Sequence, residues 1–378
     1  METEQALVDL APTLRLMLLA LVVALLPLSW VWLRQRGAST TRRLATLTTL
    51  TLFLTFDLIV FGSFTRLSDS GLGCPDWPGC YGEATPFGAR EDIVAAQTAL
   101  PSGPVTWSKA WIEMIHRYLA MTVGVLILVM AAAAWRDRRQ LPFSPWWPTF
   151  TLVWVIVQGL FGKYTVTLKL YPAIVTLHLL GGLALLALLA VQHEAFRNRP
   201  LLLARQVRGL GLLAGAALLV QIALGGWVST NYAVLACTGF PQCNGQWWPA
   251  MDAAQGFTIL RELGQGRDGG VLPFEALVAI HMAHRLFAVV VTLLLGLLAW
   301  RLWRNPSPVQ QRFGLGLALL LVAQIVSGLS NVVLGWPLLA ALGHSAGAAG
   351  LVLVLSLLLA RSSPARVASS RAMAAAAA

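Results

Sequence analysis

Nine stretches of mostly apolar residues, each long enough to cross a lipid bilayer as one helix, run through this chain. They predict membrane helices at about 12–33, 45–65, 110–134, 147–166, 172–193, 209–230, 275–300, 312–333 and 338–360. Of the 378 residues, 57% are hydrophobic and 11% are charged, whereas soluble domains are about 25% charged. A water-soluble globular protein is therefore excluded, and we expect an all-α protein that spans the membrane many times and contacts lipid.

Basic residues indicate the orientation of these helices. The connections after the first, third, fifth, seventh and ninth helices hold most of the 27 Lys and Arg residues, and such loops stay in the cytoplasm. This pattern predicts a periplasmic N-terminus carrying Glu2, Glu4 and Asp9, a cytoplasmic C-terminus, and two long outward loops at about 66–109 and 231–274. Because the charge is spread among short loops, the net charge of +11 does not indicate nucleic-acid binding.

The first apolar stretch is predicted to be a retained helix. It is too long for a signal peptide and follows acidic rather than basic residues. No Arg-rich transit peptide precedes it, which favours a bacterial inner membrane over an organelle.

The helices from the second onward form an internal repeat with an offset of 163–168 residues. The matches pair Gly62 with Gly225, Cys74 and Cys80 with Cys237 and Cys243, Gln158 and His178 with Gln324 and His344, and Glu113, His116 and Arg117 with His281, His284 and Arg285. They predict two pseudo-repeated four-helix bundles, at 44–196 and 197–361. An extra N-terminal helix with its linker (1–43) and a disordered cytoplasmic tail (362–378) complete the predicted organisation.

Four histidines lie at similar depth in the predicted helices, two in each half: His116, His178, His284 and His344. Ionisable groups are costly inside a membrane, so they indicate a function. One histidine from each of two helices suits a porphyrin iron with two axial imidazoles, and we expect one such heme in each half. Helix-packing histidines are the alternative, while zinc is disfavoured because its sites need three or four converging ligands. His193 has no counterpart and is expected to extend toward the membrane interface.

The halves differ three residues before one ligand histidine, where Glu113 corresponds to His281. This spacing puts Glu113 on the same helix face as the ligand, and a buried carboxylate can move protons or stabilise a cationic intermediate. We therefore predict that the first half is catalytic; the alternative is that Glu113 only neutralises Arg117. Arg117 and Arg285 each need an acceptor within an apolar helix, either a heme propionate or a nearby carboxylate or helix-end carbonyl. The purpose of Asp57, another acid within a predicted helix, is open.

The four cysteines lie in the two outward loops, in a compartment that permits disulfides. Bridges 74–80 and 237–243 are the simplest of the three possible connectivities. Structural bridges are favoured over redox-active ones, and the spacing does not match a metal site.

Several sequence elements resemble the heme A synthase family over about residues 44–360. They are the run Thr65-Arg66-Leu67-Ser68-Asp69-Ser70-Gly71-Leu72-Gly73-Cys74-Pro75-Asp76-Trp77-Pro78, Glu113-x-x-His116-Arg117, Thr165-Val166 followed by Pro172 and His178-Leu179, and His284-Arg285. The resemblance implies an eight-helix core of two pseudo-symmetric bundles. It also implies oxidation of the C8 methyl group of heme O, through a hydroxymethyl intermediate and with oxygen from water, to the formyl group of heme A for heme-copper oxidases.

The resemblance also implies roles for individual residues. His116 and His178 would flank the substrate heme, Glu113 would be the acid needed for catalysis, and His284 and His344 would hold a heme b cofactor. The protein would supply orientation, axial ligation and a dry pocket, while the porphyrin carries the chemistry.

Three arginines, Arg66, Arg117 and Arg285, are expected to bind propionates or position the hemes. Cys74 and Cys80 match a first-loop pair thought to take part in activity or heme delivery. The extra N-terminal helix and the second cysteine pair depart from the family pattern, so their roles are open. Beyond heme O and lipid, the candidate partners are heme O synthase and an unidentified electron acceptor, and the oligomeric state is open.

A diheme b-type electron carrier is the main alternative function, but it leaves Glu113 and the cysteine loops unexplained. A repeat-built transporter would place its polar groups near the membrane midplane, whereas those of this chain lie near the outer surface. A heme O synthase is disfavoured because the chain has no paired-aspartate magnesium motif.

Overall fold

The computed structural model describes residues 11–363, with side chains from residue 13 onward. The acidic N-terminal residues and nearly all of the predicted C-terminal tail lie outside the described residues. Within the described range the protein is all-α, apart from a few isolated bridges in the loops.

Nine helices of the described range are long and apolar enough to cross a membrane, which confirms the predicted number. They are α1 (Ala11–Arg34), α2 (Thr40–Leu67), α4 (Trp107–Arg136), α5 (Trp146–Thr167), α6 (Pro172–Arg197), α7 (Arg205–Thr230), α9 (Phe274–Trp303), α10 (Pro308–Val333) and α11 (Leu338–Arg361).

Polar and proline residues set several helix starts. Ser39 and Thr106 precede α2 and α4, and their hydroxyl groups accept hydrogen bonds from backbone N–H groups of the first turn. Pro172 and Pro308 occupy the first turns of α6 and α10, where the missing N–H is not needed. Such residues start α2, α4 and α10 three to five residues before the predicted apolar stretches, whereas α6 begins at the predicted residue.

Short helices also occur in the loops. The first outer loop contains α3 (Arg90–Ala99), and the second contains α8 (Ala253–Gly256) and a 3-10 turn (Ala233–Leu235); another 3-10 turn lies at Arg138–Gln140. A search for membrane-length apolar stretches does not detect such elements.

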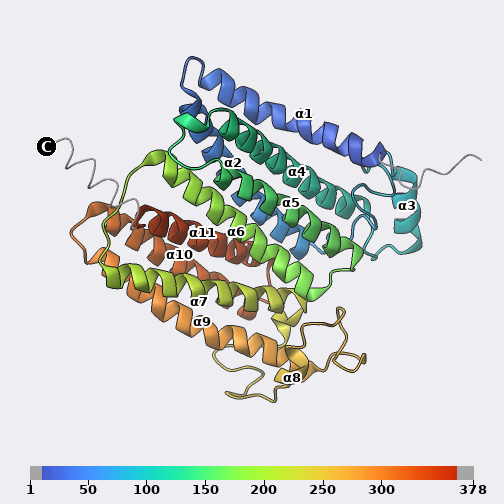
Figure 1. Cartoon of the computed structure of the whole chain (residues 1–378). Coiled ribbons are helices and arrows are strands. Elements are labelled where there is room, and N and C mark those ends of the chain that lie inside the picture. The colour runs from blue at the N-terminus through green and yellow to red at the C-terminus, as the bar shows by residue number, and fades with distance from the viewer. Residues whose placement is uncertain (1–10, 364–378) are drawn as a thin grey trace, which may run out of the picture. The chain divides into compact units, whose positions relative to one another are not determined.

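The chain divides into two compact units. The first comprises the chain up to Leu141 together with Pro148–Leu170, and the second comprises Pro142–Trp147 and the chain from Tyr171 onward. In the first unit, α4 packs against α2 and α1. In the second unit, α9 packs against both α7 and α10, and α11 contacts α10, α6 and α7; Figure 1 shows these helices side by side.

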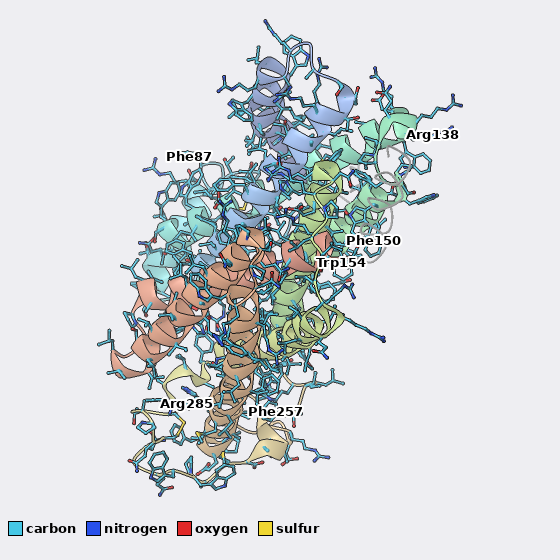
Figure 2. The ribbon with its side chains drawn as sticks, turned by 90° about the vertical axis from the view of Figure 1, so that its left-hand side faces the viewer. Phe87, Arg138, Phe150, Trp154, Phe257 and Arg285 are labelled. Atoms are coloured by element: carbon cyan, nitrogen blue, oxygen red, sulfur yellow. A yellow bond between two sulfur atoms is a disulfide. The ribbon has the colours of Figure 1, made fainter. Side chains whose placement is uncertain are left out.

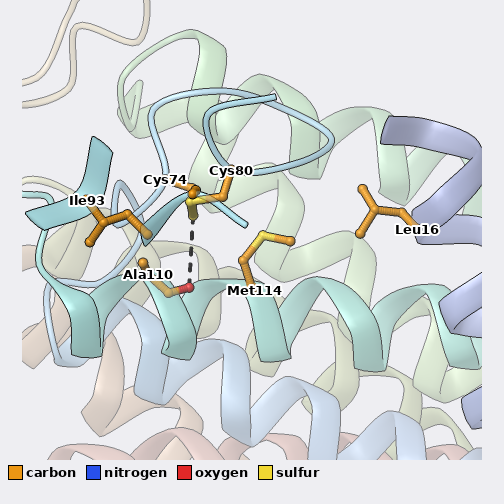
Figure 3. Packing of buried hydrophobic residues seen from close by; sticks show 7 residues of the cluster. Leu16, Cys74, Cys80, Ile93, Ala110 and Met114 are labelled. Carbon is orange, nitrogen blue, oxygen red and sulfur yellow. Dashed lines mark hydrogen bonds between the residues drawn. A yellow bond between two sulfur atoms is a disulfide. The ribbon is translucent and has the colours of Figure 1, made fainter. Parts of the chain in front are cut away.

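The extra helix α1 contributes to the buried core of the first unit. Leu16 belongs to a cluster with the two first-loop cysteines, Ile93 and Met114 (Figure 3). Next to it, Arg15 forms an exposed ion pair with Glu83 of the same loop, at 3.6 Å. The helix therefore helps to hold the first outer loop.

Candidate functional site

Both outer loops are closed by the predicted intraloop disulfides, which we call the first-loop disulfide (Cys74–Cys80) and the second-loop disulfide (Cys237–Cys243). All four cysteines are buried. In the first unit, the Cys74 sulfur lies 3.9 Å from the carbonyl oxygen of Ala110 on α4, the contact drawn as a dashed line in Figure 3. In the second unit, Cys237 and Cys243 cluster with Val278 and Met282 of α9. Each disulfide therefore packs on one helix that carries a candidate heme ligand, α4 or α9.

Arg117 attaches the first loop to α4. Its Nη1 donates hydrogen bonds to the carbonyl oxygens of Asp76, Pro78 and Gly79, at 3.0, 3.2 and 2.5 Å. Its Nη2 forms an ion pair with Glu113, one turn earlier on the helix. One guanidinium group thus connects the loop backbone to the predicted catalytic carboxylate.

The Glu113 carboxylate is buried and held from two sides. One oxygen pairs with Arg117, and the other accepts a hydrogen bond from the backbone N–H of Cys74 at 2.8 Å. The pairing that sequence analysis gave as the alternative for Glu113 is therefore present. It fixes the position of the carboxylate and does not test the catalytic role.

The second unit repeats this arrangement with an imidazole in place of the carboxylate. Arg285, which lies on α9 beside the second outer loop (Figure 2), donates to the carbonyl oxygens of Gln242, Cys237 and Gly239 at 3.1–3.2 Å. Its Nε donates to Nε2 of His281 at 3.0 Å.

The protonation of His281 follows from its partners. Arginine only donates, so Nε2 of His281 is an acceptor, and Nδ1 donates to the Ala233 carbonyl at 2.9 Å. Both ring nitrogens are thus in use, and this imidazole has no nitrogen left for a metal or a substrate.

The two predicted heme ligands of the second unit face each other. The rings of His284 on α9 and His344 on α11 have centroids 6.5 Å apart and planes inclined by 74°. Two imidazole nitrogens that each bind one iron at about 2 Å place the ring centroids roughly 6–7 Å apart. The observed separation would therefore suit an iron porphyrin held by these two histidines.

Side chains on the facing helices orient these rings. The Ser327 hydroxyl donates to the Ala323 carbonyl at 2.6 Å and lies 3.0 Å from Nδ1 of His344. Because the hydroxyl hydrogen is committed, Ser327 accepts from Nδ1–H, which leaves Nε2 of His344 unprotonated and able to bind a metal. A Gln221 nitrogen lies 3.1 Å from Nδ1 of His284 and also donates to the His284 carbonyl oxygen.

Glycines face three of the four histidines. A Cβ atom built on Gly62 would lie 2.8 Å from Cε1 of His116, and one on Gly225 would lie 2.9 Å from Cε1 of His284. At Gly328 the corresponding distance, to His344, is 3.2 Å. Because any larger residue would push the ring away, these glycines let the imidazoles pack directly against the neighbouring helix backbone.

The remaining two predicted ligands belong to different units. His116 lies on α4 of the first unit, where its ring stacks on Phe61 with centroids 6.4 Å apart. His178 lies on α6 of the second unit, and its Nδ1 is buried without a hydrogen-bond partner among the described residues. Their pairing across a substrate heme stays a prediction.

The other candidate residues differ in their exposure. Arg66 lies half-buried at the end of α2, and Asp57 is exposed in the middle of that helix. His193 is 9% exposed, so the expectation that it extends toward the membrane interface is wrong; it packs inside the second unit because α6 continues to Arg197. No group of three or more His, Cys, Asp or Glu residues converges among the described residues.

Sequence analysis missed Gln221, Ser327 and Gly328 as supports of the histidines. A signal was available, since Gln and Gly recur four residues apart at 158/162, 221/225 and 324/328. This spacing puts both residues on one helix face, toward the same neighbouring helix.

Comparison with known proteins identifies similar sequences. A family model described as a cytochrome oxidase assembly protein, COX15-CtaA, matches residues 45–356. A heme A synthase from Shewanella oneidensis is 41% identical over 311 residues, which cover 81% of this chain and 92% of that relative. Heme A synthases from Shouchella clausii and Paracoccus denitrificans are each 26% identical, over 67% and 78% of this chain and 73% and 81% of the respective relatives. The range matched by the family model contains both disulfides and all four histidines.

Proposed function

Because this chain belongs to the COX15-CtaA family of cytochrome oxidase assembly proteins, we propose that it oxidises heme O to heme A. In this proposal the C8 methyl group of heme O becomes a formyl group through a hydroxymethyl intermediate, with oxygen from water. The observation that carries the proposal is the facing pair His284 and His344, whose ring separation of 6.5 Å suits an iron porphyrin.

We assign His284 and His344 to a resident heme b. The donor set fits this group, because both rings are oriented by neighbouring polar side chains and at least His344 presents an unprotonated nitrogen. A heme b bound there would supply one-electron redox chemistry. Gly225 and Gly328 would keep the two rings at the separation that the iron requires.

We assign the substrate heme to His116 and His178, with Glu113 as the acid–base group. The fixed position of the Glu113 carboxylate, between Arg117 and the Cys74 N–H, supports a role that needs defined geometry. From there Glu113 would accept a proton or stabilise positive charge that develops on the substrate.

The arginines after the ligands would act mainly as positioning residues. Arg117 and Arg285 donate to loop carbonyls and to a neighbouring side chain, which supports the positioning part of the prediction. A propionate contact for them or for Arg66 stays part of the proposal. The first-loop disulfide is proposed to keep the Cys74 N–H in place for Glu113.

The wider organisation is also proposed. Two pseudo-repeated four-helix bundles, at 44–196 and 197–361, would each hold one heme in a bacterial inner membrane. Both cysteine loops and the N-terminus would face the periplasm and the C-terminus the cytoplasm. Heme O synthase and an electron acceptor would be the partners. Matching contacts at the two cysteine loops support this arrangement.

The experiment is pigment analysis of the purified protein from cells that make heme O. A reduced-minus-oxidised spectrum reports bis-histidine heme, and acid extraction followed by chromatography reports heme A or its hydroxylated intermediate. We expect Glu113→Gln to retain heme but to lose conversion by roughly 100-fold or more, the usual contribution of a general acid–base group. Glu91→Gln, which changes an exposed glutamate on α3 of the first outer loop, is the control and should convert normally.

Two results would contradict the proposal. Full conversion by Glu113→Gln would remove that residue from catalysis. Heme b without any oxidised product would instead support the diheme electron carrier, which uses the same four histidines.

A further inference from the structure

Arg261 lies in the second outer loop, between α8 and α9, where the usual pattern of exposure is reversed. Leu260 is 84% exposed and Ile259 is also exposed, whereas Arg261 is only 5% exposed. Loops normally bury their apolar residues and leave arginine in water. The inward arginine therefore indicates an internal partner.

The partners of Arg261 among the described residues are all neutral. Its Nη2 donates to the side-chain oxygen of Asn231 at 2.5 Å, and its Nη1 donates to the Gln265 carbonyl at 3.2 Å. Its guanidinium carbon lies 5.7 Å from the centre of the Trp227 ring. Nε of Arg261 is buried and has no hydrogen-bond partner among the described residues. One donor of the guanidinium group is therefore unused.

A negative partner is also missing. Arg117 pairs with Glu113 and Arg361 pairs with Glu194, but no Asp or Glu within residues 13–363 forms an ion pair with Arg261. Burial lowers the pKa of the Arg261 guanidinium below its usual value. A buried cation with an unused donor is unfavourable unless an anion completes the site.

The position of Arg261 suggests which anion this is. Its partner Asn231 lies six residues beyond Gly225, which faces a proposed cofactor ligand, so it is about 9 Å farther out along α7. In the same unit, Tyr171 packs in one cluster with Trp227, the ring over which Arg261 lies, and it is seven residues before His178, about 10 Å along α6. Arg261 therefore contacts residues that lie about 9–10 Å beyond the proposed ligands along their helices, on the side of the second outer loop.

Resting on the proposed function, we propose that Arg261 binds the carboxylate of a porphyrin propionate at the outer end of the second unit. Arginine suits this ligand because its planar group donates two parallel hydrogen bonds to a carboxylate. The carboxylate would belong either to the heme held by His284 and His344 or to the substrate porphyrin at His178. The experiment below separates these two sources.

The test compares heme binding in the purified, heme-loaded protein. Arg261→Gln removes the charge, Arg261→Lys keeps it, and Arg267→Gln removes a charge from an exposed arginine of the same loop as the matched control. The first arm measures the transfer rate of heme b to apomyoglobin and the midpoint potential of the bound heme. The second arm measures the Kd of added heme O by difference spectroscopy. Neither arm depends on catalytic turnover.

We expect Arg261→Gln to weaken binding by roughly ten- to a hundred-fold in one arm, the usual effect of losing a hydrogen-bonded charge. Arg261→Lys should recover part of this loss. If the cofactor is the source, heme b transfers faster and its potential becomes more negative. If the substrate is the source, only the Kd for heme O rises.

A second variant keeps the test informative if Arg261→Gln folds poorly. Asn231→Asp retains Arg261 and places a carboxylate on its existing partner, so the protein supplies its own anion. This variant should weaken porphyrin binding in the same arm while stabilising the loop. If Arg261 only anchors the loop, Asn231→Asp leaves porphyrin binding unchanged.

The outcomes separate this inference from the proposed function. If heme A is produced but Arg261→Gln and Asn231→Asp match Arg267→Gln in both arms, the propionate site is wrong and the proposed function stands. A wild-type protein that binds no heme would overturn both.

Discussion

The glycines that face the proposed heme ligands make a graded prediction. A Cβ atom at position 225 would lie 2.9 Å from the His284 ring, whereas normal carbon contacts are about 3.5–4.0 Å. In Gly225→Ala the ring must therefore move by roughly 0.6–1.1 Å. In Gly328→Ala the starting distance to His344 is 3.2 Å, and the required shift is only about 0.3–0.8 Å.

These shifts exceed what an iron–imidazole bond tolerates. Ligand distances in metal sites vary by only about 0.2 Å, and overpacking of a protein interior costs about 1–3 kcal/mol. We therefore expect Gly225→Ala to weaken binding of the resident heme by roughly 5- to 150-fold, and Gly328→Ala to weaken it less. The specific expectation is that Gly225→Ala weakens heme binding more than Gly328→Ala does.

Two glycines of the same helices provide matched controls. A Cβ atom at Gly215 on α7 or at Gly316 on α10 would meet nothing within 4 Å. Alanine at a helix position without steric conflict stabilises by about 0.5–1 kcal/mol, so these variants should keep their heme.

The assay is the heme content per protein, measured as the pyridine complex, together with the reduced-minus-oxidised spectrum. Normal heme content and an unchanged spectrum in Gly225→Ala would show that the His284 ring does not pack against this glycine when heme is bound. An equal loss in Gly215→Ala would show that the effect comes from the helix and not from the ring contact.

Three further perturbations follow from contacts within the units. Ser327→Ala removes the acceptor beside His344, the second proposed cofactor ligand, so heme affinity should fall about 10- to 100-fold. Ser330→Ala on the same helix is the control and should not change the heme content. Arg117→Lys replaces a planar group that contacts three loop carbonyls, so dithiothreitol should reduce the first-loop disulfide several-fold faster. Thiol alkylation and mass spectrometry measure this rate, and an unchanged rate would contradict the role of Arg117 in holding the loop. Leu16→Ala opens space beside that disulfide and should lower stability by about 2 kcal/mol or more, seen as a lower melting temperature, while Arg15→Ala at the exposed ion pair should change it little.

The membrane helices could be predicted from the sequence because lipid leaves the backbone few choices. Every polar backbone group inside the bilayer must be paired, so a long apolar stretch forms a helix whatever its neighbours are. The ends depended on local chemistry instead. Ser39 and Thr106 continue α2 and α4 beyond the apolar residues because their hydroxyl groups satisfy free N–H groups.

The partners of the arginines could not be predicted in the same way. The sequence shows that Arg117 needs an acceptor, but a carboxylate, a carbonyl and a propionate satisfy this need equally well. The choice depends on the path of a loop that lies about 40 residues earlier in the chain, and no local pattern determines that path. For the same reason, the burial of Arg261 was not apparent from the sequence, where it stands among ordinary loop residues.

The two cysteine loops show how similar frameworks carry different chemistry. In each unit an arginine next to a candidate heme ligand holds loop carbonyls and contacts the side chain one turn earlier. That side chain is Glu113 in the first unit, where all of its contacts donate to the carboxylate, and His281 in the second, where both nitrogens are already in use. Each oxygen of the Glu113 carboxylate has more than one lone pair, so Glu113 can still accept a proton from a bound substrate, whereas His281 cannot. The two frameworks therefore differ at this one residue, and we infer that its identity restricts proton-coupled chemistry to the unit that carries Glu113.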